Sequence, residues 1–488
     1  MPLPFIIINR GYFLVVCLLL SIIISIIIAT AVPLEKDELG ALVNIYLPVF
    51  TGAATLLIYG AVVLISKNIK LRLLVLVLFA SISIFTGVIL NLSFYSFNRQ
   101  LQTISASNVL PSVTSPDNDK IEIRNLDNFP TGNRAVFSYT YDPNLPYGAN
   151  KHKNTIINHD ATIVRIINHE KKSITIKEAS FSSKGLWAAS IANKQNEGII
   201  LPATILPGDS LDVSIIFTAK ALNKRVESIW WKAALKFQHF AIGIARLFNY
   251  QLPYGSTCAN INGQLLFKTA DRDLTLKPVQ LNGIWEYRYE NDWEPGLQMI
   301  LNSLNFKTKV GFTYFDNGLK GEKTTDWSDE IAADYFEVAN ASQPVKIRKI
   351  ASYHGCCTVE DSDTLAIYDL NRQLTRQLQY TNKYSGQMLL PLASEMPDSK
   401  HLSNLSGPFA VKIGLSFTDR TRNHDKKIGI RVWKAVDEHG KVIDNAYILG
   451  SDYLGKKGTN YDYQDNVYYI ENIKLYNNKS TIPLMAQK

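Results

Sequence analysis

The hydrophobic residues of the first hundred positions are gathered in three long, almost uncharged runs at 12–32, 41–66 and 73–94. Each run is long enough to cross a bilayer as an α-helix. Beyond residue 100 such runs disappear, and apolar and polar residues alternate over short segments. The pattern predicts a three-helix membrane anchor at 1–98, a polar linker at 99–120, and a mainly β region after it.

The charges between the apolar runs predict the orientation of the anchor. The loop at 33–40 is acidic, whereas the loop at 67–72 holds three basic residues. Because basic loops stay on the cytoplasmic side, we expect a cytoplasmic N-terminus and an extracytoplasmic region after residue 94. The alternative is a cleaved signal peptide ending near residues 29–31, but the first run is longer than a typical signal core. Residues 12–94 are therefore expected to contact the lipid bilayer.

Short β-strands with turn residues between them recur over 121–225. Residues 161–168 read ATIVRIIN and residues 211–218 read LDVSIIFT, with an apolar residue at every second position. Strands of this length, separated by turns such as the LPGDS at 206–210, are typical of a β-sandwich. The sequence thus predicts an immunoglobulin-like sandwich over 121–225.

A different period appears at 226–255, where aromatic, aliphatic and basic residues recur at helical spacing. This predicts an amphipathic helical insert, which either lies on a membrane surface or packs as a crossover helix. Strand patterns return afterwards and continue to the C-terminus. We therefore expect a second, larger sandwich-like β domain over 256–488.

Two ordered sets of motifs resemble known families. The succession ATIVRIIN, SITIKEASF and LPATILPGDSLDVSIIFTAK within 154–220 resembles the ASH-type immunoglobulin-like domain. The landmarks GIW and EPGL within 283–297, RVW at 431–433 and NYDYQDNVYY at 460–469 are similar to the C-terminal β unit of bacterial extracellular proteins of unsettled function. The resemblance to the ASH-type domain implies a seven-stranded sandwich that serves as a spacer or protein-binding module, with no catalytic residue.

The composition changes this picture little. The chain has 51 Lys and Arg against 43 Asp and Glu, for a net charge of +8. It has neither a basic block nor an RNA-reading motif, so we do not expect nucleic acid as a partner. Hydrolase and P-loop motifs are also missing, which favours a protein that is not an enzyme. The enzyme alternative is a glycan hydrolase that uses the carboxylates near Trp285–Glu294.

An acidic, amide-rich segment near the C-terminus is a candidate metal site. Asp and Asn side chains supply the hard oxygen ligands that Ca²⁺ prefers, and the candidate ligands are Asp452, Asn460, Asp462, Asp465 and Asn466. The glycine of an EF-hand loop is missing. The alternative is an Asx-rich turn whose side chains cap the backbone by local hydrogen bonds.

A second candidate site combines an aromatic ring with carboxylates. Asp316, Asp326 and Trp327 lie in a glycine-containing polar segment. An exposed indole ring there could stack on a sugar whose hydroxyls bind the carboxylates, although an ordinary solvated loop has the same composition.

Cysteine usage fits an oxidising compartment. Cys258, Cys356 and Cys357 lie in the region predicted to be extracytoplasmic, where disulfides persist. We expect a structural disulfide, either between Cys258 and one of the adjacent pair, which would leave one thiol over, or between Cys356 and Cys357, which would be strained.

Taken together, these features predict a membrane-anchored extracytoplasmic binding or adhesion protein. Its expected partner is a surface polysaccharide or an envelope protein, with Ca²⁺ as a candidate cofactor. A glycan hydrolase and a subunit of an envelope membrane complex remain as alternatives.

Overall fold

The computed structural model describes fourteen segments of the chain, which are residues 120–130, 132–142, 159–192, 198–226, 258–270, 274, 276–288, 294–312, 320–354, 364–379, 387–391, 400–402, 405–455 and 459–476. The chain divides into two compact units, Met1–Thr103 with Ile229–Leu247 and Ile104–Ser228 with Phe248–Lys488. All the described residues belong to the second unit. The predicted anchor and nearly all of the predicted helical insert lie outside them. None of the helices within the described segments has the length and apolar character of a membrane span.

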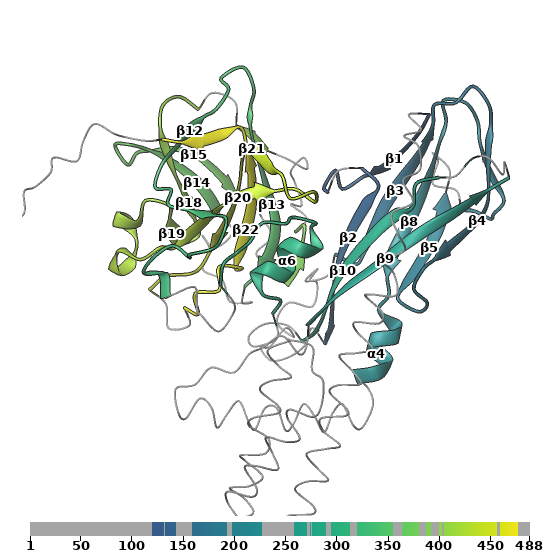
Figure 1. The fold of residues 1–488 in the computed structure, drawn as a ribbon, viewed down its shortest axis with the longest axis horizontal. Helices are drawn as coiled ribbons and strands as arrows, with labels where there is room; N and C mark the ends of the chain where they lie inside the picture. The colour runs from purple at the N-terminus through teal and green to yellow at the C-terminus, as the bar shows by residue number, and fades with distance from the viewer. Residues whose placement is uncertain are drawn as a thin grey trace, which may run out of the picture. The chain divides into compact units, whose positions relative to one another are not determined.

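Two five-stranded sheets form the first sandwich (Figure 1). Sheet A has the order β1-β3-β8-β5-β6, with β1 Ile121–Asn125, β3 Ala161–Asn168, β8 Ser210–Phe217, β5 Trp187–Ala192 and β6 Gly198–Ile199. Sheet B has the order β2-β10-β9-β4-β7, with β2 Arg134–Asp142, β10 Val279–Arg288, β9 Cys258–Thr269, β4 Ile174–Phe181 and β7 Ala203–Ile205. A short helix, α4 (Lys220–Val226), follows β8.

Period-two alternation accounts for the core of this sandwich. In β3 the side chains of Val164 and Ile166 are buried, whereas that of Ile163, one position before Val164, is partly exposed. Aromatic rings from both sheets fill the interior. The ring of Trp187 lies 5.0 Å from that of Phe137 and 4.5 Å from that of Phe217, measured between centroids. The predicted sandwich is therefore present, with one face of each strand directed inward.

Strands β9 and β10 extend the first sandwich beyond the boundary expected at residue 256. They follow the predicted insert in the sequence, yet they pair with β4 and with β2 in sheet B. The contact between β10 and β2 is parallel and places Gly283 opposite Phe137. Strand pairing between segments this far apart leaves no local pattern in the sequence, so the boundary differs from the expected one.

A second sandwich contains the remaining strands. Sheet C has the order β11-β20-β21-β22-β13-β16, with β17 also paired to β13; its strands are β11 Glu330–Ile331, β20 Ile430–Val436, β21 Val442–Ser451, β22 Asn466–Glu471, β13 Val345–Tyr353, β16 Gln387–Leu389 and β17 Lys400–Leu402. Sheet D has the order β15-β14-β18-β12-β23, with β19 paired to β18; its strands are β15 Leu374–Gln379, β14 Thr364–Asp369, β18 Phe409–Ile413, β12 Phe336–Val338, β23 Ile473–Leu475 and β19 Ser416–Phe417. A core that includes Phe336, Ile347 and Val432 lies between the two sheets.

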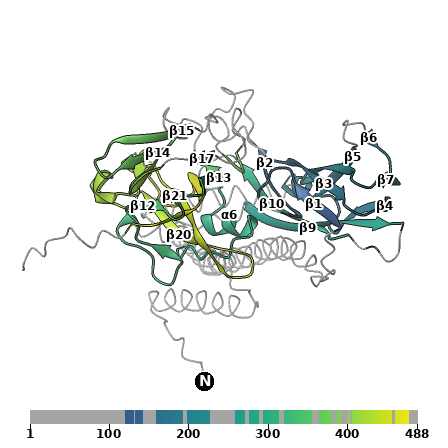
Figure 2. The same ribbon diagram turned by 90° about the horizontal axis from the view of Figure 1, so that it is seen from above.

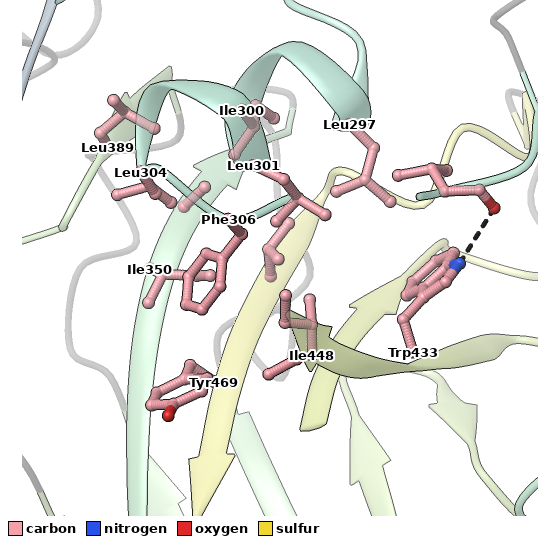
Figure 3. Close-up of a cluster of buried hydrophobic side chains, with 14 of the residues drawn as sticks. Leu297, Ile300, Leu301, Leu304, Phe306, Ile350, Leu389, Trp433, Ile448 and Tyr469 are labelled. Atoms are coloured by element: carbon pink, nitrogen blue, oxygen red, sulfur yellow. Dashed lines mark hydrogen bonds between the residues drawn. The ribbon is translucent and has the colours of Figure 1, made fainter. Parts of the chain in front are cut away.

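The other face of sheet C is covered by the short helix α6 (Leu297–Ser303) (Figures 2 and 3). Leu297, Ile300 and Leu301 pack there with Trp433, whose indole N–H donates to the carbonyl of Val310 at 3.0 Å. Val136 of β2 and Ile284 of β10 belong to this same cluster. At β2 and β10, sheet B thus contributes to both cores, with the first core on one face and the α6 cluster on the other.

Candidate functional site

Trp327 is the most exposed large apolar side chain among the described residues, with 97% of its surface accessible to solvent. Its backbone adopts a left-handed conformation, with φ of 59°. A bulky residue in this region carries steric strain. Both features lower the stability of the folded state, because the left-handed backbone is strained and an indole left in water gains no burial free energy. Exposed, strained residues of this kind concentrate at binding sites.

The loop that carries Trp327 is held firmly on its inner side. The carboxylate of Glu330 accepts hydrogen bonds from the backbone N–H of Thr325 at 2.8 Å and from its hydroxyl at 2.7 Å. The hydroxyl of Ser328 donates to the carbonyl of Thr325 at 2.9 Å. Below them, Arg431 pairs with Glu330 and also donates to the carbonyl of Lys323 at 3.0 Å. The loop is therefore ordered before any ligand arrives.

The outer part of the loop offers polar groups beside the indole. Asp326 is exposed and lies 3.6 Å from the ammonium of Lys323. Asp329 accepts from the backbone N–H of Lys309 at 2.6 Å. Of the three predicted ligand-binding residues, Trp327 and Asp326 are thus adjacent and exposed, while Asp316 lies outside the described residues.

The predicted metal ligands lie in the turns between β21 and β22, and their carboxylates face backbone groups. Asp452 accepts from the backbone N–H groups of Tyr453, Tyr461 and Asp462. Asp462 accepts from the side chain of Asn460 and from the backbone N–H of Gln464. Local hydrogen bonds of this kind are the alternative that the sequence left open for this segment.

Burial has a large effect on the ionisation of these acids. It raises the pKa of Asp452 well above its usual value, and the nearby charge of Asp462 adds to the effect. It also raises the pKa of Asp462 to about 7. The pKa of Asp465 is raised by burial and then by both of those carboxylates. Asn466 is also buried, with its amide 3.0 Å from the hydroxyl of Tyr453.

Within the described segments, no group of three or more acidic, histidine or cysteine side chains is arranged to hold a metal ion. Oxygen donors of the right type are nevertheless present, since one oxygen of Asp452 and one of Asp462 have no hydrogen-bond partner. The binding of Ca²⁺ by these residues therefore stays a prediction.

The acidic segment at 452–466 supports the Trp327 loop through the ring of Tyr463, which contacts Arg431. Tyr463 also has a left-handed backbone, with φ of 60°, and its hydroxyl donates to the carbonyl of Ile428 at 2.7 Å. The guanidinium of Arg431 lies 4.7 Å from the centre of this ring. Arg431 also pairs with Glu330, so the acidic segment at 452–466 and the Trp327 loop both contact this one buried side chain. No local pattern in the sequence predicts this contact between distant segments.

A second group of ionisable residues is buried where sheet B meets the α6 cluster. Cys258 and Glu286 are opposite one another on β9 and β10, and Thr140 of β2 donates to Glu286. Burial raises the pKa of Glu286 and that of the Cys258 thiol, which the charges of Glu286 and Glu294 raise further. Burial likewise raises the pKa of Tyr353.

These buried groups bear on the hydrolase alternative. Glu286 and Glu294 are only 2% and 8% exposed, and Glu294 accepts from Gln464 at 3.0 Å. A carboxyl pair that cleaves a polymer must meet it in a cleft, whereas these two lie among packed side chains. The other carboxylates of the predicted set, Glu290 and Asp292, lie outside the described residues.

The disulfide prediction concerns residues of which only one is described. Cys258 is buried at the start of β9, and Cys356 and Cys357 lie outside the described segments. The pairing therefore stays a prediction.

One group of side chains was missed by sequence reasoning. Arg372, Arg420 and Arg422 come together with Tyr368 and Phe417 at one end of sheet D. They belong to two hairpins and a 3₁₀ turn, so no motif joins them. The short sequence RTR at 420–422, directly after the buried Asp419 and three positions after Phe417, is the only local signal.

No protein-family model matches the chain, and no curated protein matches it. Among solved structures, it is similar to the ASH/PapD-like domain 7 of human CEP192, with 11% identity over 38% of this chain and 95% of that one and a TM-score of 0.16. It is also similar to the YadV chaperone, with 8% identity over 66% and 96% and a TM-score of 0.17. The periplasmic chaperone SfaE gives 8% identity over 66% and 96%, with a TM-score of 0.16.

Proposed function

We propose that this chain is a membrane-anchored, extracytoplasmic binding protein that recognises a surface polysaccharide through the Trp327 loop. The observation that carries the proposal is the combination of full exposure and backbone strain at Trp327. A folded chain keeps such a residue at a cost to its stability, and ligand binding is the usual reason. The apolar runs at 12–94 and the acidic loop between the first two support the location.

The geometry of the loop suits a polymer ligand. The indole offers a flat apolar surface with an N–H at its edge, and Lys323 and Asp326 beside it provide a donor and an acceptor for sugar hydroxyls. The hydrogen bonds of Thr325 and Ser328 keep the loop ordered, so binding does not have to fix it. A sugar ring stacked on the indole and bonded at its rim is the complex that we expect.

Binding by the full-length chain in mild detergent tests this proposal. Affinity electrophoresis through gels that contain dextran, xylan or galactomannan reports retardation by each neutral polysaccharide. We expect Trp327→Ala to weaken the retardation by at least tenfold, because central tryptophans in binding surfaces contribute about 2 kcal/mol or more. Trp327→Phe should recover part of it.

The matched control is Ile200→Ala, which removes another exposed apolar side chain, 90% accessible, from the first sandwich. This variant should migrate like the parent. Equal retardation of the parent and of Trp327→Ala in every gel that retards the parent would contradict the proposal. So would the loss of binding in Ile200→Ala.

A further inference from the structure

We propose that the arginine cluster at the end of sheet D, formed by Arg372, Arg420 and Arg422, binds oxyanion groups, sulfate or phosphate, on the polymer that the Trp327 loop recognises. This inference rests on the proposed polysaccharide binding and adds to it the charge class of the ligand.

Arg422 packs against two aromatic rings that also contact each other. The central carbon of its guanidinium lies 4.3 Å from the centre of the Tyr368 ring and 3.8 Å from that of the Phe417 ring. Tyr368 comes from β14 and Phe417 from β19, so two different hairpins supply the rings. The side chain of Arg422 is partly exposed. Stacking fixes the plane of the guanidinium while its N–H groups stay available at the edge.

Two further guanidinium groups stand close to Arg422. Arg372, at the turn between β14 and β15, donates to the hydroxyl of Thr421 at 3.2 Å. Arg420 donates to the carbonyl of Lys426 at 2.9 Å and to that of Glu322 at 3.3 Å. Arg420, Thr421 and Arg422 together form the 3₁₀ turn η4. The three cations are thus gathered on one turn and the neighbouring hairpin.

No carboxylate neutralises these cations at ion-pair distance within the part of the chain that the structure describes. The nearest buried acid, Asp419, accepts from the backbone N–H and hydroxyl of Thr421 and from the hydroxyl of Tyr335. By contrast, the exposed Arg124 of the first sandwich is paired with Glu122 at 2.6 Å. The charge of Arg372 acts on Asp419 and that of Arg420 on Asp334. Two carboxylates beside three guanidinium groups leave a net positive charge, which an external oxyanion neutralises.

The cluster adjoins the Trp327 loop. Arg420 reaches the carbonyl of Glu322, and the backbone N–H of Ile428 donates to the carbonyl of Gly321 at 2.7 Å. Both acceptors lie at the start of the loop that carries Trp327. The arginine cluster and the Trp327 loop are therefore joined by hydrogen bonds, and Glu322 lies five positions before Trp327 in the sequence. This continuity favours an anionic polysaccharide over a separate small anion.

Planar guanidinium groups bind sulfate and phosphate by paired N–H donors, with higher affinity than isolated ammonium groups provide. Dextran and dextran sulfate form a matched pair of probes, since they share one glucan backbone and differ only in the anion. The full-length chain in detergent should bind dextran sulfate at least tenfold more tightly than dextran. This preference should decline as salt is raised, because the ions screen partly exposed charges.

Arg372→Gln and Arg422→Lys test which groups provide the preference. Arg372→Gln removes a charge whose guanidinium, among the described residues, donates to the exposed Thr421 and also acts on Asp419, so its effect on folding should be small. It should weaken binding of dextran sulfate about tenfold and leave dextran binding unchanged. Arg422→Lys keeps the charge but loses the planar fork, and a similar loss would identify stacking as the important property. Arg124→Gln, in the first sandwich, is the control for the change in net charge.

The outcomes separate this inference from the proposed function. Equal binding of dextran and dextran sulfate, both lost in Trp327→Ala, would overturn the anion site and leave the polysaccharide site intact. Binding of neither polymer would overturn both. Lipid phosphate is the other source of the same chemistry. If vesicles of phosphatidylglycerol, but not of phosphatidylcholine, bind in an Arg372-dependent way while dextran sulfate does not, the assignment to a polymer is wrong.

Discussion

Glu330 and Arg431 form an ion pair that is shielded from water on all sides, with side chains 1% and 0% exposed. Glu330 lies at the start of β11 and Arg431 near the start of β20, next to one another in sheet C. The pair fixes the inner end of the Trp327 loop, because each partner also bonds to the loop backbone. A buried pair of this kind adds little net stability over apolar residues, but it is costly to break.

Glu330→Gln should therefore destabilise the protein strongly. The substitution removes the carboxylate charge that faces the buried guanidinium of Arg431, which costs about 3–5 kcal/mol. The change can be measured by denaturant unfolding of the full-length chain. The exposed pair between Glu337 and Lys474 provides the control, because Glu337→Gln should cost less than about 1 kcal/mol. Equal effects of the two substitutions would show that burial of the Glu330–Arg431 pair has no energetic consequence.

Trp327→Gly should separate stability from binding. Glycine adopts φ near 59° without strain, so the free energy of unfolding should stay level or rise by up to about 1 kcal/mol. Polysaccharide binding should be lost together with the indole. Thermal unfolding and affinity electrophoresis measure the two effects on the same sample. A clear fall in the unfolding temperature would mean that Trp327 packs against other residues and is not a free binding surface.

Asp462→Asn should stabilise the protein at high pH. Burial raises the pKa of Asp462 to about 7, above its ordinary value of 3.8, so the folded state binds this proton more tightly than the unfolded state does. The stability that this group contributes is complete below about pH 4 and is lost as the pH rises through 7. Asparagine does not ionise, and its carbonyl still accepts from Asn460. The variant should thus unfold at least about 2 °C above the parent at pH 8, with a much smaller difference at pH 4.

The same experiment addresses calcium. Adding Ca²⁺ or a chelator to the parent at pH 8 shows whether a cation binds the folded form, since such binding raises the unfolding temperature. If Ca²⁺ stabilises the parent and Asp462→Asn abolishes the shift, the carboxylates hold a metal. The variant would then be the less stable protein in Ca²⁺, contrary to the expectation above.

Gly450→Ala should be among the most damaging small substitutions in β21. A Cβ atom at this position would lie 2.5 Å from the backbone carbonyl of Tyr463, which has no rotamer by which to move away. We expect a loss of about 1–3 kcal/mol in unfolding free energy, the usual cost of overpacking. Gly198→Ala is the control, since no atom lies within 4 Å of the Cβ position there. Similar stability of both variants would contradict the close approach of the two segments.

The sequence predicts the local elements of the first sandwich well. The alternating residues at 161–168 form β3 with the expected bounds, and the strand expected at 211–218 differs from β8 by one residue at each end. The reason is physical, because alternation with period two is enforced by a single buried face along each strand. Mainly β architecture and sandwich-like packing are confirmed in the described residues.

The sequence does not predict which strands pair when they are far apart along the chain. Nothing in β9 or β10 indicates that they join sheet B, because strand pairing depends on backbone groups that every residue carries. The exposure of Trp327 fits a loop that was proposed from composition alone. The arginines beside Tyr368 and Phe417, by contrast, come from separate hairpins and become neighbours only in the folded chain.

The pairing of β2 has a consequence for the order of synthesis. Among the described strands its only neighbour in sheet B is β10, which follows it by more than a hundred residues. Apart from the bridge between Ser138 and His159, the N–H and C=O groups of β2 lack their sheet partner until residue 288 has been made, a state open to mispairing with other chains. The first sandwich is therefore completed only after residues 227–257 have been synthesised. A factor that binds the growing chain would have to shield β2 from other chains during that interval.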